Sequence, residues 1–289
     1  MVHPSGDAPK TIMLAAALNG RGDRALDRAA DLATAWDADL LVVHALEDAG
    51  PFSAGRPTPS WRRPPDVAER VERTVRSDIR GPCPRLRFHI EEGPALKVIL
   101  EAAHRERPDL LVVAMGRDGL FGQISRTVDE LFRQSPVSLL VVKQRPGGPY
   151  RHVVVGADYS EEARIALETA TRLFPGAATV VMHAYDMPYR NLYLDPSLAE
   201  RFGSVEQQTM ATWLTGADLP VGERPVALIE HGPPEAMLAA YVREKNADLT
   251  VIGAYGRSRF FHSVVGGAGP RILQAVDSDV LVVRPPPPV

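Results

Sequence analysis

Glycines that follow an apolar, strand-like segment near the carboxyl end of the chain are the residues best suited to chemistry. Gly253 and Gly256 follow the run 249–252, and after a spacer of nine residues come Gly266 and Gly267. Glycines at a strand-to-helix turn let backbone N–H groups close around an anion, and the start of a helix carries partial positive charge. The spacing GxxG-x9-GG therefore predicts a phosphate-binding loop.

The alternative interpretation of this segment is an ordinary surface loop. Gly269 is a poor helix former and Pro270 has no N–H to donate, although proline is favoured in the first turn of a helix. Arg257 lies inside the loop and can neutralise phosphate charge, whereas exposed arginines are often only solvated. The preceding strand, the spacing and the following helical pattern all agree, and this agreement favours phosphate binding.

Composition narrows the class of protein. The chain has 289 residues, a net charge of −3 and one cysteine, Cys83. No global field draws it to nucleic acid or anionic lipid, and no internal disulfide can form. The amino terminus has no apolar signal core, and no run approaches the roughly 18 apolar residues of a membrane span. We expect a cytoplasmic protein with no nucleic-acid or membrane partner.

An internal repeat organises the chain. Gly232 lies 139 positions after Gly93, and Asp248 lies 139 positions after Asp109. Each glycine is followed by proline, comes after an extended segment and precedes a helical pattern. Two landmarks at one spacing indicate two copies of one unit.

Each copy has the same order of apolar strands and amphipathic helices. Continuous apolar strands that alternate with such helices predict an α/β fold with a parallel sheet covered on both faces. The segment 144–149 has two prolines and little apolar content, so it predicts a linker between domains at 1–146 and 150–289. Helices are also expected from about Val67 and at the end of the long region after Asp186.

Asp158 directly follows a buried strand in the second copy. Ser160 comes two residues later and precedes two acidic residues, a pattern that predicts a helix start with Ser160 as its cap. His44 and His183 lie at equivalent strand ends, where a histidine is more often a hydrogen-bonded structural residue than a catalyst.

The order of elements, the turn 158–160 and the spacing Gly253-x2-Gly256-x9-Gly266 together resemble a tandem universal stress protein over nearly the whole chain. The resemblance implies two tandem Rossmann-like domains, each a five-stranded parallel sheet flanked by helices. It also implies an adenine nucleotide at the carboxyl edge, with Asp158 at its adenine or ribose. The family usually has Ser or Thr after the third glycine, where this chain has Gly267.

The same resemblance implies an intramolecular pseudo-dimer of the two repeats. The closing strands, which end at Lys143 and Arg284, would form its contacts. A homodimer of chains is compatible with this arrangement, and the sequence does not determine it.

The first copy has a degenerate form of the loop. Ala114 occupies the position of Gly253, Gly116 and Gly119 form a GxxG out of register, and the connection is four residues shorter. The counterpart of Asp158 is expected at Leu18 or Asn19, so no carboxylate is available there. Ser125 and Thr127 remain as possible anion contacts, and this half is expected to pack or recognise something else.

Two functions of different classes fit these observations. The first is a stress-response or regulatory protein that binds ATP or another adenine nucleotide, with or without Mg²⁺, mainly in the second domain. The second is a scaffold or small-molecule sensor that does not bind nucleotide and whose repeats are mainly structural. Slow ATP hydrolysis is a third, weaker hypothesis, because no positioned general base is visible and no HExxH, CxxC, GxSxG or P-loop motif occurs.

Overall fold

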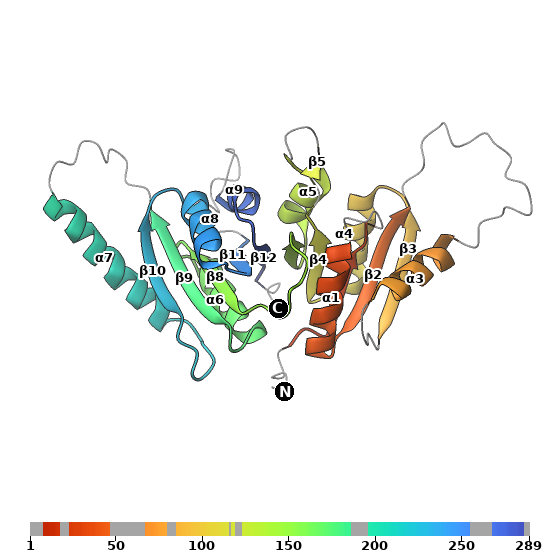
Figure 1. Cartoon of the computed structure of the whole chain (residues 1–289), viewed down its shortest axis with the longest axis horizontal. Coiled ribbons are helices and arrows are strands. Elements are labelled where there is room, and N and C mark those ends of the chain that lie inside the picture. Colours follow the sequence, from red (N-terminus) through yellow and green to blue (C-terminus); the bar gives the residue numbers. More distant parts are fainter. Residues whose placement is uncertain are drawn as a thin grey trace, which may run out of the picture. The chain divides into compact units, whose positions relative to one another are not determined.

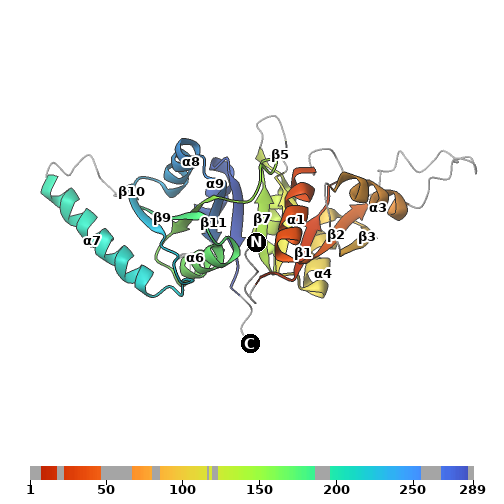
Figure 2. The same cartoon turned by 60° about the horizontal axis from the view of Figure 1, so that its bottom comes forward.

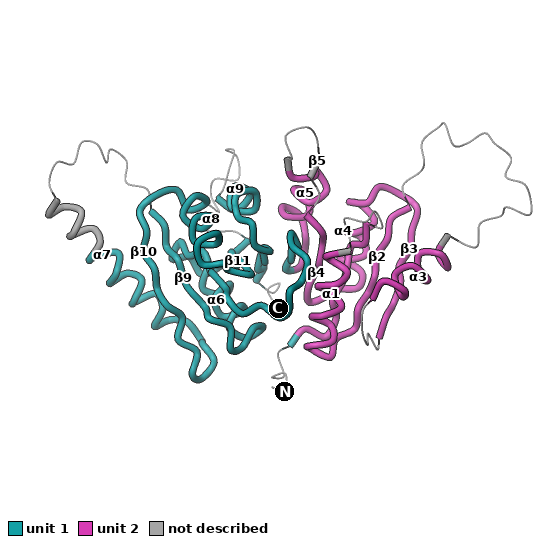
Figure 3. Tube along the Cα trace, viewed as in Figure 1, with its two compact units in different colours: residues 1–8, 138–289 teal, residues 9–137 magenta. Residues whose placement is uncertain are grey.

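The computed structural model describes residues 8–17, 23–46, 67–79, 85–115, 117–118, 123–185, 196–254 and 268–285 (Figure 1). The chain divides into two compact units (Figure 3). One is Pro9–Val137, here called the N-terminal unit. The other comprises Met1–Ala8 and Ser138–Val289 and is called the C-terminal unit.

The N-terminal unit is a parallel sheet with helices packed on it. Four of its described strands pair in the order β4-β1-β2-β3, and every pairing among these four is parallel. The strands are β1 (Thr11–Ala15), β2 (Asp39–Leu46), β3 (Leu86–Glu92) and β4 (Leu110–Ala114). The helices are α1 (Asp23–Trp36), α3 (Val67–Asp78), α4 (Ala95–Glu106) and α5 (Arg126–Gln134). The interiors of β1, β2 and β4 are buried, as expected for strands covered on both faces, whereas the outer strand β3 is only partly buried.

The C-terminal unit has the strand order β10-β9-β8-β11-β12-β7. Its strands are β7 (Ser138–Val142), β8 (His152–Ala157), β9 (Ala178–Tyr185), β10 (Val226–His231), β11 (Leu249–Gly253) and β12 (Asp279–Val283). The pairings among β8 to β12 are parallel, and β7 pairs antiparallel with β12. The predicted α/β class, with a mostly parallel sheet flanked by helices, is confirmed.

Helices cover both faces of the C-terminal sheet. They are α6 (Glu161–Leu173), α7 (Pro196–Thr215), α8 (Pro234–Lys245) and α9 (Ala268–Ala275). Parallel crossovers are right-handed, so the direction of each chain crossing decides which face its helix covers. Helices α8 and α9 contact each other on one face, with α6 on the other (Figure 2). Helix α7 runs beside the outermost described strand, β10 (Figure 1).

An aspartate at the same place in each copy fixes the register of the first strand. Asp109 Oδ2 accepts hydrogen bonds from the amides of Lys10 and Thr11 at 2.7 and 2.9 Å. Asp248 Oδ2 accepts the equivalent pair of hydrogen bonds from the amides of Arg151 and His152 at 2.8 and 2.9 Å. The aspartates that reveal the repeat in sequence therefore tie the start of β1 and β8 to the neighbouring strand.

The closing strand of the first copy, β7, belongs to the C-terminal unit. The antiparallel register pairs Val141 with Val280 and Leu139 with Val282, and the Arg284 amide donates to Ser138 Oγ at 3.1 Å. The boundary between the two compact units, between Val137 and Ser138, therefore lies one strand before the linker 144–149 that the sequence predicts.

The side chain of Asp279 holds the linker to this unit. It is 1% exposed, and its Oδ1 accepts hydrogen bonds from the amides of Lys143 and Gln144 at 2.7 and 3.2 Å. Its Oδ2 accepts from the hydroxyl of Tyr150 at 2.6 Å. A buried carboxylate requires such donors to offset its desolvation. Ser138 occupies the matching position at the start of β7, and its Oγ accepts from the Arg284 amide as Asp279 accepts from the Lys143 amide.

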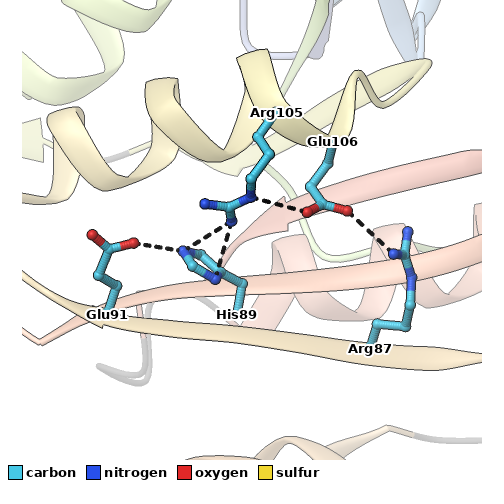
Figure 4. Close-up of polar contacts among 5 residues, drawn as sticks. All are labelled: Arg87, His89, Glu91, Arg105 and Glu106. Carbon is cyan, nitrogen blue, oxygen red and sulfur yellow. Dashed lines mark hydrogen bonds and ion pairs between the residues drawn. The ribbon is translucent and has the colours of Figure 1, made fainter.

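A charged network spans β3 and α4 on the N-terminal unit (Figure 4). Arg105 donates to the His89 ring at 3.2 Å, and the other ring nitrogen donates to Glu91 at 2.8 Å. Glu106 accepts from Arg105 and Arg87, both at 3.2 Å. The hydrogen bond from Arg105, together with the charge of Arg87, lowers the pKa of the Glu106 carboxyl. The contribution of Glu106 to folding stability is therefore lost as the pH falls through that lowered pKa. Charges on an outer strand also oppose pairing with another chain.

Loss of the Tyr150 hydroxyl tests the Asp279 cluster. We predict that Tyr150→Phe lowers the free energy of unfolding by about 1.5–3 kcal/mol, because the lost bond goes to a buried, charged acceptor. Urea denaturation measures this. Tyr241→Phe is the matched control: its hydroxyl bonds a histidine ring at 2.9 Å, and its loss should cost about 1 kcal/mol. Equal losses in the two variants would contradict the assignment.

Candidate functional site

The candidate site lies where β8 and β11 end. These strands are neighbours in the sheet, with Val153 opposite Leu249 and Val155 opposite Val251. Asp158 follows the last residue of β8, and Gly253 is the last residue of β11. The fold therefore brings these two predicted site residues to the same carboxyl edge, which is where open α/β sheets bind ligands.

Asp158 begins a tight turn that starts α6. Its Oδ1 accepts hydrogen bonds from the Ser160 amide at 3.1 Å and from the Ser160 hydroxyl. Ser160 Oγ in turn accepts from the Ala163 amide at 3.1 Å and caps the helix. The predicted cap is confirmed, and Asp158 is built into it.

Gly253 has a packing reason to be glycine. A Cβ there would lie 2.8 Å from the backbone C and O of Glu162 and 3.1 Å from the amide of Ala163, both in the first turn of α6. Backbone cannot move aside as a flexible side chain can. Sequence reasoning assigned Gly253 to the turn and to phosphate approach, and it missed this contact with α6.

The other predicted site residues, Gly256, Arg257, Gly266 and Gly267, lie outside the described residues. The helix that was expected after them is present, since α9 begins at Ala268. Its first turn contains a proline, which is tolerated there because the first amides of a helix have no intrahelical partner.

Tyr159 was not singled out from the sequence, and it is the most unusual residue of this edge. Its φ is +60°, in the left-handed region that bulky residues rarely adopt. Its ring stacks on His183, with centroids 4.1 Å apart and planes at 30°. Its hydroxyl donates to Glu206 Oε2 of α7 at 3.0 Å. Glu206 carried no sequence signal, because α7 follows a long segment without clear periodicity.

His183 has the structural role that was predicted. Its Nδ1 lies 2.8 Å from the carbonyl oxygen of Ala157, which can only accept, so Nδ1 carries the hydrogen. Its Nε2 lies 3.5 Å from Glu206 Oε2. In the first copy His44 makes the equivalent 2.8 Å contact with the carbonyl of Ala16.

These two contacts also show that the predicted counterpart of Asp158 in the first copy was wrong. Asp158 follows Ala157, so its partner is the residue after Ala16, which is Ala17 and not Leu18 or Asn19. The repeat spacing is 141 positions at the first and the closing strands and 139 at the landmarks between them, which displaced the sequence alignment. The first copy still has no carboxylate at this position.

The row of rings continues across the carboxyl ends of β9 and β10. Tyr185 lies nearly parallel to His183, with centroids 6.2 Å apart. His231 meets Tyr185 edge to face at 5.4 Å. Both ring nitrogens of His231 are buried, and no residue of the described ranges hydrogen-bonds to them.

The corresponding edge of the N-terminal unit is built differently. After β4 come two short strands, β5 (Arg117–Asp118) and β6 (Gln123–Ile124), which pair antiparallel. Ser125 caps α5, its Oγ accepting from the Val128 amide at 3.4 Å, so its hydroxyl has a structural role. Gly116 and Gly119 lie outside the described residues.

Two other kinds of site are absent from the residues that the structure describes. Within the described ranges, no three His, Cys, Asp or Glu side chains gather closely enough to bind a metal ion. None of the helices in the part of the chain that the structure describes is long and apolar enough to cross a membrane.

Comparison with protein families decides the relationship. The model of the universal stress protein family matches the chain twice, at residues 9–143 and 149–284. The chain belongs to the universal stress protein family. Two matches in one chain make it a tandem member, as the sequence resemblance indicated. A search of curated proteins gave no match.

Solved structures agree with a tandem universal stress protein fold. A protein of unknown function from Pseudomonas aeruginosa PAO1 is 16% identical, with a TM-score of 0.68, covering 96% of this chain and 94% of its own. A universal stress protein from Pseudomonas aeruginosa UCBPP-PA14 is 17% identical, with a TM-score of 0.66 and the same coverages. One from Archaeoglobus fulgidus is 16% identical, with a TM-score of 0.62, covering 94% of this chain and 98% of its own. At these identities the likeness shows the fold.

The contact between Gly253 and α6 gives a stability prediction. Gly253→Ala places a methyl group against helix backbone and should lower the free energy of unfolding by about 1–3 kcal/mol, the usual cost of overpacking. Chemical denaturation of the full chain measures it. Gly147→Ala is the control, because nothing lies within 4 Å of a Cβ at that position. If the two variants unfold alike, α6 does not pack as described.

Proposed function

We propose that this universal stress protein is a cytoplasmic regulatory protein of the stress response that binds ATP or another adenine nucleotide in its C-terminal unit. The observation that carries the proposal is that Asp158 and Gly253 meet at one carboxyl edge of a parallel sheet. Family membership and the GxxG-x9-GG spacing support it.

Each proposed contact has a chemical reason. The Asp158 carboxylate accepts hydrogen bonds and suits a ribose hydroxyl or the adenine amino group. The amides of Gly256, Gly266 and Gly267 suit phosphate oxygens before the positive end of α9, and Arg257 supplies charge. Mg²⁺ would accompany the phosphates of ATP and contribute charge neutralisation there.

The proposal assigns nucleotide to one copy of the repeat. The first copy has Ala17 in place of Asp158 and Ala114 in place of Gly253. Its Ser125 hydroxyl is engaged as a helix cap. An alanine offers neither an acceptor for the nucleoside nor the conformational freedom of glycine.

Binding is proposed in preference to hydrolysis. The carboxylate of the site is Asp158, and its Oδ1 already accepts from both the amide and the hydroxyl of Ser160. A general base must instead reach the attacking water. We assign to Asp158 the role of holding the ligand.

The alternative is a scaffold or small-molecule sensor in which both repeats are mainly structural. One observation favours it: Asp158 and Gly253 each have a structural role, in the α6 cap and in packing against α6. Only ligand binding separates the two proposals.

Isothermal titration of the purified full chain with ATP tests the proposal. We predict that Asp158→Asn, which keeps the Oδ1 acceptor of the turn and removes the charge, weakens binding about tenfold or more. Gly266→Val should weaken binding to a similar extent, because the valine side chain would keep the phosphates from the backbone amides of the loop. Ser125→Ala in the first copy is the matched control and should leave the affinity unchanged. Thermal melts check that each variant is folded.

Two results would contradict the proposal. One is a wild-type chain that binds no adenine nucleotide, which favours the scaffold. The other is an ATP affinity that Ser125→Ala lowers and Asp158→Asn leaves unchanged, which moves the site to the first copy.

A further inference from the structure

We propose that helix α7 is coupled to the ligand site through the turn 158–160, so that nucleotide binding and α7 docking strengthen each other. The inference rests on the proposed function, because it takes Asp158 as the nucleotide contact. It adds that the docking of α7 responds to whether nucleotide is bound. The relevant observation is that consecutive residues of one turn serve the site and the helix.

Successive residues of the turn have different partners, the ligand for the first and helix α7 for the next two. Asp158 is the residue assigned to the ligand. Tyr159 donates its hydroxyl to Glu206 Oε2 of α7 at 3.0 Å, and the Ser160 carbonyl accepts from the indole of Trp213, also on α7, at 3.2 Å. Asp158 Oδ1 also accepts from Ser160. Any force that moves Asp158 therefore acts on both hydrogen bonds to α7.

The backbone of Tyr159 supplies the second state that coupling requires. A bulky residue at φ +60° is strained, and its contacts must hold it there. Those contacts are the stack on His183 and the bond to Glu206. When α7 leaves, Tyr159 loses the Glu206 bond and can return to negative φ. The turn then changes, and Asp158 changes its direction with it.

The Glu206 side chain is suited to this role. It is partly buried, and the same Oε2 lies 3.5 Å from Nε2 of His183. His183 is itself fixed by its contact with the Ala157 carbonyl at the end of β8. The α7 carboxylate therefore meets both members of the stacked pair next to the ligand site.

Helix α7 lies at the edge of the C-terminal unit, where one of its faces is exposed to solvent. It lies beside β10, the outermost described strand, in both views (Figures 1 and 2). Its Met210 and Trp213 are buried on the unit, whereas Val205 is 56% exposed. One face of α7 thus depends on the turn while another faces solvent.

Linkage makes the coupling measurable, because a helix that tightens ligand binding must itself be tightened by the ligand to the same extent. The test uses the full chain with Trp36 and Trp61 replaced by Phe, which leaves Trp213 as the fluorophore. ATP is titrated into this background and into the same background with Tyr159→Phe or Glu206→Ala. Tyr241→Phe, a tyrosine hydroxyl bonded to His152 at the other end of β8, is the control.

We expect ATP to change the Trp213 emission in the background chain and in the control. Tyr159→Phe and Glu206→Ala should each weaken ATP binding about fivefold or more, the lower end of typical couplings, and reduce the emission change. A purely structural role would lower the melting temperature without removing the response of Trp213 to ATP.

Tyr159→Gly is a second variant that guards against misfolding. Glycine adopts positive φ without strain, so the turn keeps its backbone while the link to Glu206 is lost. This variant should keep its ATP affinity and show a reduced emission change of Trp213. Unchanged ATP affinity in Tyr159→Phe and Glu206→Ala, or an undiminished emission change in Tyr159→Gly, would overturn the coupling and leave the proposed function standing. A background chain that binds no ATP would overturn both.

Discussion

The close packing of the first turn of α6 on the end of β11 is the constraint on which the C-terminal unit depends. No Cβ fits at Gly253, because backbone atoms of Glu162 occupy that space. Ser160, three residues after the end of β8, caps helix α6 at this point. The ends of two neighbouring strands are thereby fixed, and Asp158 is held between them. The geometry of the carboxyl edge thus follows from a packing contact. The same contact fixes the position of Asp158, the residue proposed to bind the ligand.

A buried carboxylate, Asp279, orders the opposite edge of the sheet in the same unit. Asp279 gathers the linker amides and the Tyr150 hydroxyl, and Lys143 donates its ammonium to the carbonyls of Leu273 and Val276 at the end of α9. A cation suits this end of a helix, where the carbonyls and the dipole are negative. Helix α9 is therefore held at its carboxyl end by the linker, while its amino end follows the proposed phosphate loop.

Local rules were enough to predict most of the fold and part of the site. The strands and helices followed from apolar periodicity, and the Ser160 cap and the bonded His183 followed from residue type and position. The role of Tyr159 could not be predicted, because its conformation depends on Glu206, 47 residues away on a helix with no sequence landmark. Contact between the closing strands β7 and β12 was expected only from family resemblance, and their antiparallel register was not predicted. The Asp279 cluster depends on contacts more than 100 residues apart in sequence. Long-range contacts of this kind have no period that a sequence reveals.

The central claim is that the two copies differ, with a nucleotide site in the C-terminal unit alone. Native mass spectrometry of the full chain with excess ATP tests this most directly, because it counts bound ligands per molecule. The account predicts that one nucleotide binds per chain and that Asp158→Asn removes it. Two nucleotides per chain, or one that persists in Asp158→Asn and is lost when the first copy is altered, would contradict it.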